Sequence, residues 1–259
     1  MAQPTVQEML EAGVHFGHLK RKWNPAMAPY IFMEKNGTHI IDLNKSSAKL
    51  EEACSAIKSM ARSGKKILYV ATKKQAQGII AREAARVNMP YVTERWPGGM
   101  LTNFATIRKA IRKMGAIDKM EVDGTWETMS KRERLMISRQ RAKLERDLGS
   151  IQDLTRLPSA IFIVDVIKEH IAVKEAHRLG IPTFAIVDTN ANPKDVDFAI
   201  PGNDDAAKSI ELIVKTMTNA VAEGLAERKA GKAKEDEAEA SAKEVKEVVA
   251  ETSEEKNED

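Results

Sequence analysis

The chain has 259 residues, which is enough for one large domain or for one domain with an insertion. Charged residues make up 31% of it and aromatic residues 5%, and no apolar run reaches the roughly 18 residues that a transmembrane helix needs. The N-terminal segment lacks the basic and apolar regions of a secretory signal. A single cysteine, Cys54, excludes an intrachain disulfide and a cysteine-based zinc site. We therefore expect a cytoplasmic protein without membrane contact.

The net charge of +3 conceals a strong asymmetry along the chain. In residues 1–157, Lys and Arg outnumber Asp and Glu by 12, whereas in residues 158–259 Asp and Glu outnumber Lys and Arg by 9. Such a distribution favours a polyanionic partner on one side of the molecule. A solvated surface with uneven charge is the alternative, and the counts do not decide between the two.

The first elements are predicted from caps and turns. Thr5 and Glu8 have the spacing of a capping box, which predicts a short helix, and an irregular segment with two prolines follows it. Asn36-Gly37 between two apolar runs is typical of a β-hairpin. Asn44 then caps a predicted helix. Cys54 lies on the apolar face of this helix, so we expect it in the core and not as a nucleophile.

From residue 67 onwards, short apolar runs alternate with helical patterns. This alternation predicts an α/β fold in which a parallel sheet is flanked by helices, with right-handed crossovers. The predicted strands span residues 67–72, 91–93, 160–165, 183–188 and 198–200. The predicted helices span residues 74–87 and 204–225. A third predicted helix lies between the strands of residues 160–165 and 183–188 and ends at residues 179–180.

Two segments depart from this alternation. Residues 105–157 carry two helical patterns and no strand, and Ser130 with Glu133 forms a second capping box. We predict a projecting antiparallel helical hairpin, or coiled coil, inserted into an α/β domain of residues 1–104 and 158–225. Residues 226–259 are rich in Ala, Glu and Lys and predict a disordered acidic tail, although their Lys–Glu spacing favours extending the last helix by a few turns.

Enzyme motifs are absent. The sequence contains no P-loop, no dinucleotide fingerprint, no HExxH and no GxSxG. Asp165 and Asp188 each end an apolar strand, where α/β folds often bind ligands. Capping of the turns that follow is the alternative, and it is the interpretation that we favour.

One group of side chains has the composition of a metal site. His15 and His18 lie three residues apart, and the candidate oxygen ligands lie far along the chain. The predicted ligands of a structural divalent metal such as zinc are His18, Asp188, Asp204 and Asp205. Imidazoles hydrogen-bonded to the backbone are the alternative, and no cofactor is required for the predicted function.

Basic segments carry the strongest functional signal. Three cations beside Trp23 combine charge for phosphates with a flat ring for bases or sugars. Both arms of the predicted hairpin carry more cations than ion pairs with Glu133 and Glu145 can neutralise. The predicted RNA-binding residues are Lys20, Arg21, Lys22, Trp23, Lys73, Lys74, Arg95, Arg108, Lys109, Arg112, Lys113, Arg132, Arg134 and Arg139.

Three runs carry a family resemblance, namely MLEAGVHFGHLKRKWNPAMAPYIF, ERWPGGMLTNFATI and PSAIFIVDVIKEHIAVKEAHRLGIPTFAIVDTNANP. In this order they resemble the bacterial small-subunit ribosomal protein S2 family, over about residues 5–225. The resemblance implies a flavodoxin-like domain with a protruding coiled coil and no catalysis. It also implies binding to small-subunit ribosomal RNA (rRNA), contacts with neighbouring ribosomal proteins, help in docking the OB-repeat protein S1, and no homo-oligomer.

Two alternatives remain at this stage. A flavodoxin-like nucleotide-binding enzyme would use Asp165 and Asp188 at the strand ends. A free RNA-binding regulator would bind RNA without joining a ribosomal particle.

Overall fold

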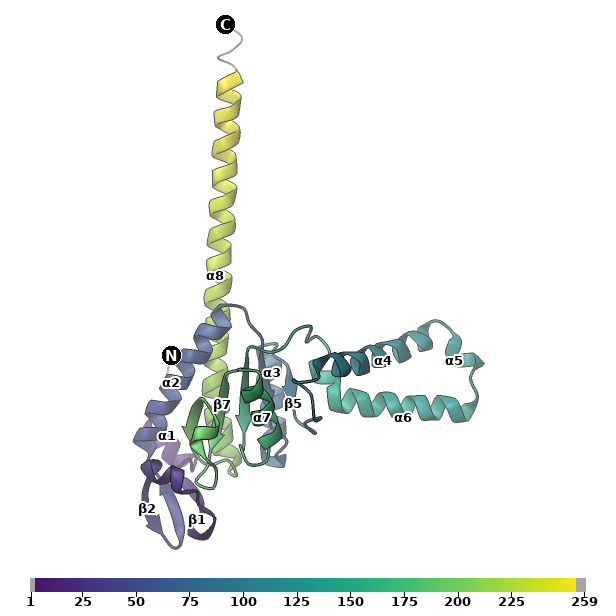
Figure 1. Cartoon of the computed structure of the whole chain (residues 1–259). Helices are drawn as coiled ribbons and strands as arrows, with labels where there is room; N and C mark the ends of the chain where they lie inside the picture. Colours follow the sequence, from purple (N-terminus) through teal and green to yellow (C-terminus); the bar gives the residue numbers. More distant parts are fainter. Residues whose placement is uncertain (1–2, 255–259) are drawn as a thin grey trace.

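A five-stranded parallel sheet lies at the centre of the molecule (Figure 1). The computed structural model describes the backbone of residues 3–254 and the side chains of residues 3–120 and 122–231. The strand order is β5-β4-β6-β7-β8, and every neighbouring pair is parallel. The strands are β4 (Ile67–Val70), β5 (Tyr91–Val92), β6 (Ala160–Val164), β7 (Thr183–Val187) and β8 (Phe198–Pro201). The predicted fold class is confirmed.

Helices cover both faces of this sheet, and each face has its own core. Helices α2 (Leu43–Arg62), α3 (Lys74–Arg86) and α8 (Ala207–Glu254) pack on one face, against Tyr69 and Phe162. On the other face, α7 (His170–Arg178) and the base of the inserted hairpin pack against Leu68 and Ile163. Strands buried on both sides explain why the sequence shows continuous apolar runs instead of alternation.

Cys54 lies in the first of these cores, as predicted. Its side chain is 1% exposed, and its Sγ lies 3.5 Å from the Sδ of Met217 on α8. Burial raises the pKa of the Cys54 thiol to about 12. The thiol is therefore protonated at neutral pH and is not a nucleophile.

The N-terminal segment forms a small antiparallel sheet of order β1-β3-β2. Its elements are α1 (Val6–Glu11), β1 (Phe16–Leu19), the 3-10 helices η1 (Lys20–Lys22) and η2 (Pro25–Tyr30), β2 (Ile31–Lys35) and β3 (Thr38–Ile41). The capping box at Thr5 and the β2–β3 hairpin are confirmed. Strand β1 was not predicted, and the N-cap of α2 is Asp42 instead of Asn44.

An antiparallel pair of helices projects from the body (Figure 1). It consists of α4 (Phe104–Val122), α5 (Thr125–Thr128), α6 (Lys131–Leu148) and the 3-10 helix η3 (Gly149–Ile151). The capping box of Ser130 and Glu133 is present. Near the body, Ile107, Ile111 and Leu148 belong to the core of the sheet. The apolar seam of the hairpin therefore serves both to pair the helices and to attach them to the sheet.

The last helix is longer than expected. Helix α8 begins at Ala207 and ends at Glu254, so residues 226–254 are helical where the sequence predicts disorder. Ala, Glu and Lys are among the strongest helix formers, which explains the continuation. Residues 255–259 lie outside the described part of the chain. A further 3-10 turn, η4 (Pro193–Asp195), precedes β8.

Among the described residues, none of the helices combines the length and the apolar character that crossing a bilayer requires.

Candidate nucleic-acid interface

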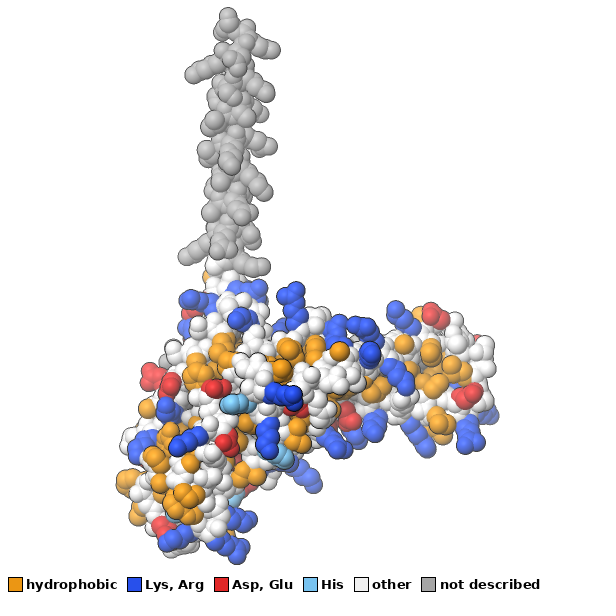
Figure 2. Space-filling view, in the orientation of Figure 1, with side chains coloured by type: hydrophobic (Ala, Val, Ile, Leu, Met, Phe, Trp, Pro, Cys, Tyr) orange, Lys and Arg blue, Asp and Glu red, His pale blue; other side chains and the backbone are white. Residues whose placement is uncertain are grey.

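The hairpin presents several cations directly to solvent. Lys109, Arg112 and Lys113 on α4 are exposed, as are Arg132 and Arg139 on α6. Within the described residues, none of these five side chains has a carboxylate partner. Figure 2 shows Lys and Arg along both margins of the projecting hairpin. Because the charges are unpaired and the arm is narrow, phosphates can approach it from more than one side.

Two other predicted RNA-binding residues, Arg108 and Arg134, form hydrogen bonds within the hairpin. The Arg108 guanidinium donates to the carbonyl oxygen of Leu154 at 3.0 Å, which fastens α4 to the end of the returning arm. The Arg134 guanidinium donates to the carbonyl oxygens of Met129 at 3.0 Å and Glu127 at 3.2 Å, and so holds the turn at the tip. These arginines support the shape of the arm, and their contact with RNA stays a prediction.

The basic loop near the N-terminus is exposed. Lys20, Arg21 and Lys22 form the 3-10 helix η1, and Trp23 follows it with 37% of its surface accessible. The Trp23 ring lies 5.2 Å from the ring of His39, centroid to centroid. Lys20 pairs with Glu34 at 2.7 Å, an exposed contact that costs little to exchange for a phosphate. Two further predicted cations, Lys74 and Arg95, are also exposed.

Lys73 has a different environment from its neighbour Lys74. Its Nζ lies 2.6 Å from Asp205, 2.7 Å from Asp204 and 3.5 Å from Asp165, and the side chain is 12% exposed. Burial alone would lower the pKa of Lys73, but hydrogen bonds to Asp204 and Asp205 outweigh it and raise the pKa. Three carboxylates already neutralise this ammonium, so the structure does not favour a phosphate contact there.

Three of the four predicted metal ligands, His18, Asp188 and Asp204, form a cluster at the carboxyl edge of the sheet, and Asp205 is not part of it. His18 Nδ1 lies 3.1 Å from Asp188 and Nε2 lies 3.4 Å from Asp205, and His18, Asp188 and Asp204 each offer a ligand atom within 4.8 Å of the others. Burial, followed by the charges of Asp188 and Asp165, raises the pKa of Asp204 to about 7.

One imidazole nitrogen and carboxylate oxygens fit a divalent metal such as zinc. Lys73, however, already occupies one oxygen of Asp204, and His15 is not among the grouped residues. The hydrogen bond to Asp188 raises the pKa of His18, so a His–Asp ion pair also satisfies this group. The metal site therefore stays a prediction.

Backbone contacts hold the His18 segment in place. The Thr189 hydroxyl accepts a hydrogen bond from the His18 amide at 2.8 Å, and Gly17 packs so closely that an added Cβ would lie 2.6 Å from the Thr189 side chain. The small antiparallel sheet is thus attached to the end of β7. This attachment brings the basic loop of residues 20–23 to the body of the protein.

One buried carboxylate organises a loop that sequence reasoning did not single out for it. Glu175 on α7 is 8% exposed and accepts hydrogen bonds from the amides of Gly99 (2.7 Å), Leu101 (2.9 Å) and Thr102 (3.1 Å), and from Trp96 Nε1 (3.2 Å). Burial alone would raise the pKa of Glu175, but these donors outweigh it and lower the pKa. The loop leads directly into α4, so Glu175 fixes the direction from which the hairpin leaves the body.

Comparison with known proteins decides the family. The family model described as ribosomal protein S2 matches residues 9–224. The chain belongs to the ribosomal protein S2 family. It is 67% identical to the small ribosomal subunit protein uS2 of Phocaeicola vulgatus over 232 residues, which is 90% of this chain and 83% of that protein.

Two other relatives bear the same name. The Porphyromonas gingivalis protein is 67% identical over 90% of this chain and 83% of its own length. The Flavobacterium johnsoniae protein is 63% identical over 88% of this chain and 89% of its own length. The recognised family resemblance is confirmed.

Members of the S2 family are structural ribosomal proteins and not enzymes. Family membership therefore decides against the nucleotide-binding enzyme. The two strand-end carboxylates have partners in the structure: Asp165 accepts from the amide of Lys168 at 3.0 Å, and Asp188 pairs with His18. Their observed contacts are those of turn-capping and ion-pairing groups.

Proposed function

We propose that this chain is a structural component of the small ribosomal subunit that binds small-subunit rRNA and thereby supports translation in the cytoplasm. The observation that carries the proposal is the row of exposed cations on the projecting hairpin, which have no carboxylate partner among the described side chains. Phosphate contacts of this kind provide affinity and orientation without reading sequence. The exposed loop of residues 20–23 adds cations and an aromatic ring to the same function.

Protein neighbours are the second part of the proposal. The small antiparallel sheet leaves apolar side chains in solvent, with exposed fractions of 50% for Phe16, 70% for Phe32 and 48% for Met33. Such a group of exposed apolar side chains is typical of a protein contact. The OB-repeat protein S1 is the partner that the family resemblance implies. We expect the chain to join the particle as one copy and not as a homo-oligomer.

Gradient sedimentation of a cell lysate at low salt and millimolar magnesium tests the proposal. We expect the chain to sediment with the small ribosomal subunit, and to move to the top of the gradient after ribonuclease treatment. A chain that stays near the top without treatment, yet binds RNA when purified, would be a free RNA-binding regulator and would contradict the proposal.

A further inference from the structure

A basic groove lies at the amino edge of the parallel sheet, opposite the edge that holds Lys73. It has a volume of about 440 Å³ and runs between the loop from α2 to β4, the end of α3, and α8. Its apolar lining includes Val87, Met89 and Leu225. Its cations are Lys65, Lys66, Arg86, Arg228 and Lys229, and among the residues whose side chains are described no carboxylate lines it.

Two of these cations have partners within the protein. Lys66 Nζ donates to the carbonyl oxygen of Asn88 at 2.7 Å, and Arg86 donates to Glu83 at 2.9 Å and to Asn219 at 2.8 Å. These contacts fix the shape of the groove. In the part of the chain whose side chains are described, no hydrogen bond or ion pair engages Lys65, Arg228 or Lys229, and all three are exposed.

The side chain of Arg228 lies against the backbone of Gly64, just after the C-terminal end of α2. A Cβ added at Gly64 would lie 2.1 Å from the Arg228 Cζ, so the guanidinium occupies the place where a side chain would stand. Gly64 also has a φ of +76°, which other residues rarely adopt. Glycine at this position therefore allows Arg228 to lie close to the groove and beside Lys65.

Helix ends alone do not account for this number of cations. The carboxyl ends of α2 and α3 carry partial negative charge, and a cation in the last turn stabilises each of them. Arg62 and Arg86 already stand in those last turns. The three unpaired cations exceed this need, and they lie side by side at one groove.

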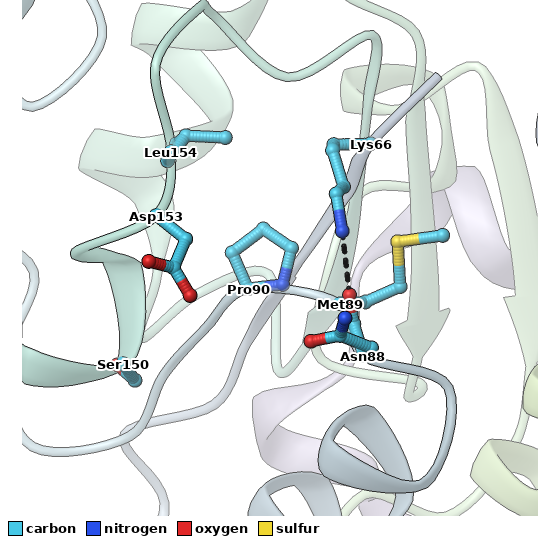
Figure 3. Close-up of a pocket in the computed structure, with 7 residues that line it drawn as sticks. All are labelled: Lys66, Asn88, Met89, Pro90, Ser150, Asp153 and Leu154. Carbon is cyan, nitrogen blue, oxygen red and sulfur yellow. Dashed lines mark hydrogen bonds between the residues drawn. The ribbon is translucent and has the colours of Figure 1, made fainter. Parts of the chain in front are cut away.

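The groove continues towards the hairpin. A second hollow shares Lys66, Asn88 and Met89 with it and is bounded on its far side by Ser150, Asp153 and Leu154 (Figure 3). Leu154 is the residue whose carbonyl holds Arg108 of the hairpin. Lys and Arg side chains lie along the upper margin of the body from α8 to the hairpin (Figure 2). The two basic surfaces are thus connected along the amino edge.

We propose that the amino edge of the sheet binds the phosphate backbone of rRNA, in a track that runs from Lys229 on α8, past Lys65 and Arg228, to the base of the hairpin. This inference rests on the proposed function and adds a second surface to it. The charge of the groove favours RNA as the occupant, because a strand of RNA offers evenly spaced phosphates to a row of cations. Among the described residues the groove itself is lined by no carboxylate, and Asp153 lines only the adjoining hollow. An acidic protein segment is the competing occupant, and the test below separates the two.

The test uses the full chain and small subunits that lack it. The triple variant Lys65→Gln, Arg228→Gln and Lys229→Gln removes the three unpaired cations and leaves the partnered ones. We expect a plot of the logarithm of the binding constant against the logarithm of the salt concentration to be less steep for this variant than for the wild type. The slopes should differ by roughly two to three. The matched control Lys174→Gln, Arg178→Gln and Lys208→Gln removes three exposed cations elsewhere and should leave the slope unchanged.

A tethered cleavage reagent identifies the occupant. Because Cys54 is buried and protonated, a Lys229→Cys variant carries one accessible thiol, to which a hydroxyl-radical source can be attached. We expect strand cleavage of rRNA near this position in the rebuilt subunit. An unchanged salt slope in the triple variant, or a bound Lys229→Cys chain that cleaves no rRNA, would overturn the inference. Failure of the wild-type chain to bind the subunit would instead contradict the proposed function.

Discussion

Glu175→Ala is expected to destabilise the protein by about 3–5 kcal/mol, because it leaves several buried hydrogen-bond donors without an acceptor. The amides of Gly99, Leu101 and Thr102 and the indole of Trp96 all donate to this one carboxylate. Leu101 and Trp96 are 2% and 6% exposed, so water does not readily replace the lost acceptor. Denaturant unfolding followed by circular dichroism measures the change.

Lys174→Ala is the matched control for this prediction. Lys174 is the exposed neighbour of Glu175 on α7, and we expect its replacement to change the free energy of unfolding by less than about 0.5 kcal/mol. Amide hydrogen exchange at Gly99, Leu101 and Thr102 should also accelerate in Glu175→Ala. An equal stability for the two variants would show that the carboxylate does not organise the loop.

The pH dependence of this effect follows from the lowered pKa of Glu175. A lowered folded-state pKa contributes stability that is present above the unfolded pKa of about 4.3 and is lost as pH falls through the folded pKa. The free-energy difference between the wild type and Glu175→Gln should therefore be largest near neutral pH and shrink in acid. A difference that grows as pH falls would contradict the assigned ionisation.

The second large effect is expected from reversing the charge of the hairpin. Changing Lys109, Arg112 and Lys113 to Glu should weaken binding to small subunits that lack this chain by roughly a hundredfold at moderate salt, since three attractive phosphate contacts become repulsive. All three side chains are exposed and unpaired within the described residues, so the fold should survive the change. Quantitative rebinding on gradients measures the loss.

The control reverses the same number of charges elsewhere. Lys174→Glu, Arg178→Glu and Lys208→Glu change the net charge equally at exposed positions outside the three proposed RNA surfaces. We expect this variant to rebind within a few-fold of the wild type. If both variants lose affinity equally, net charge and not the hairpin would determine binding.

Local patterns predicted the elements of the sheet well. Five apolar runs became the five parallel strands, because strands buried on both faces leave a strong signal in the sequence. Strand β1 was missed because Phe16 and Leu19 are exposed while Gly17 and His18 are half-buried, so no alternation marks it. The tail was predicted as disordered from its composition, yet its helix-forming residues continue α8 to Glu254.

Contacts between distant residues limited the prediction of the site. The sequence predicts Lys73 as a cation that is available to RNA, because its partners Asp204 and Asp205 follow 131 and 132 residues later. Glu175 is likewise 73 to 79 residues from the loop that it binds. By contrast, Lys109, Arg112 and Lys113 are exposed, since a projecting arm offers them few neighbours, and their contact with RNA stays a prediction.

The salt dependence of binding tests the central claim, that this chain joins the small subunit through rRNA phosphates. The wild-type chain is titrated onto small subunits that lack it, at a series of salt concentrations and constant magnesium. If about six phosphates are contacted, the affinity should fall roughly a thousandfold between low and moderate salt, with a logarithmic slope of about −4 to −5. An affinity that is nearly independent of salt would mean that protein contacts hold the chain in place, and would contradict the account.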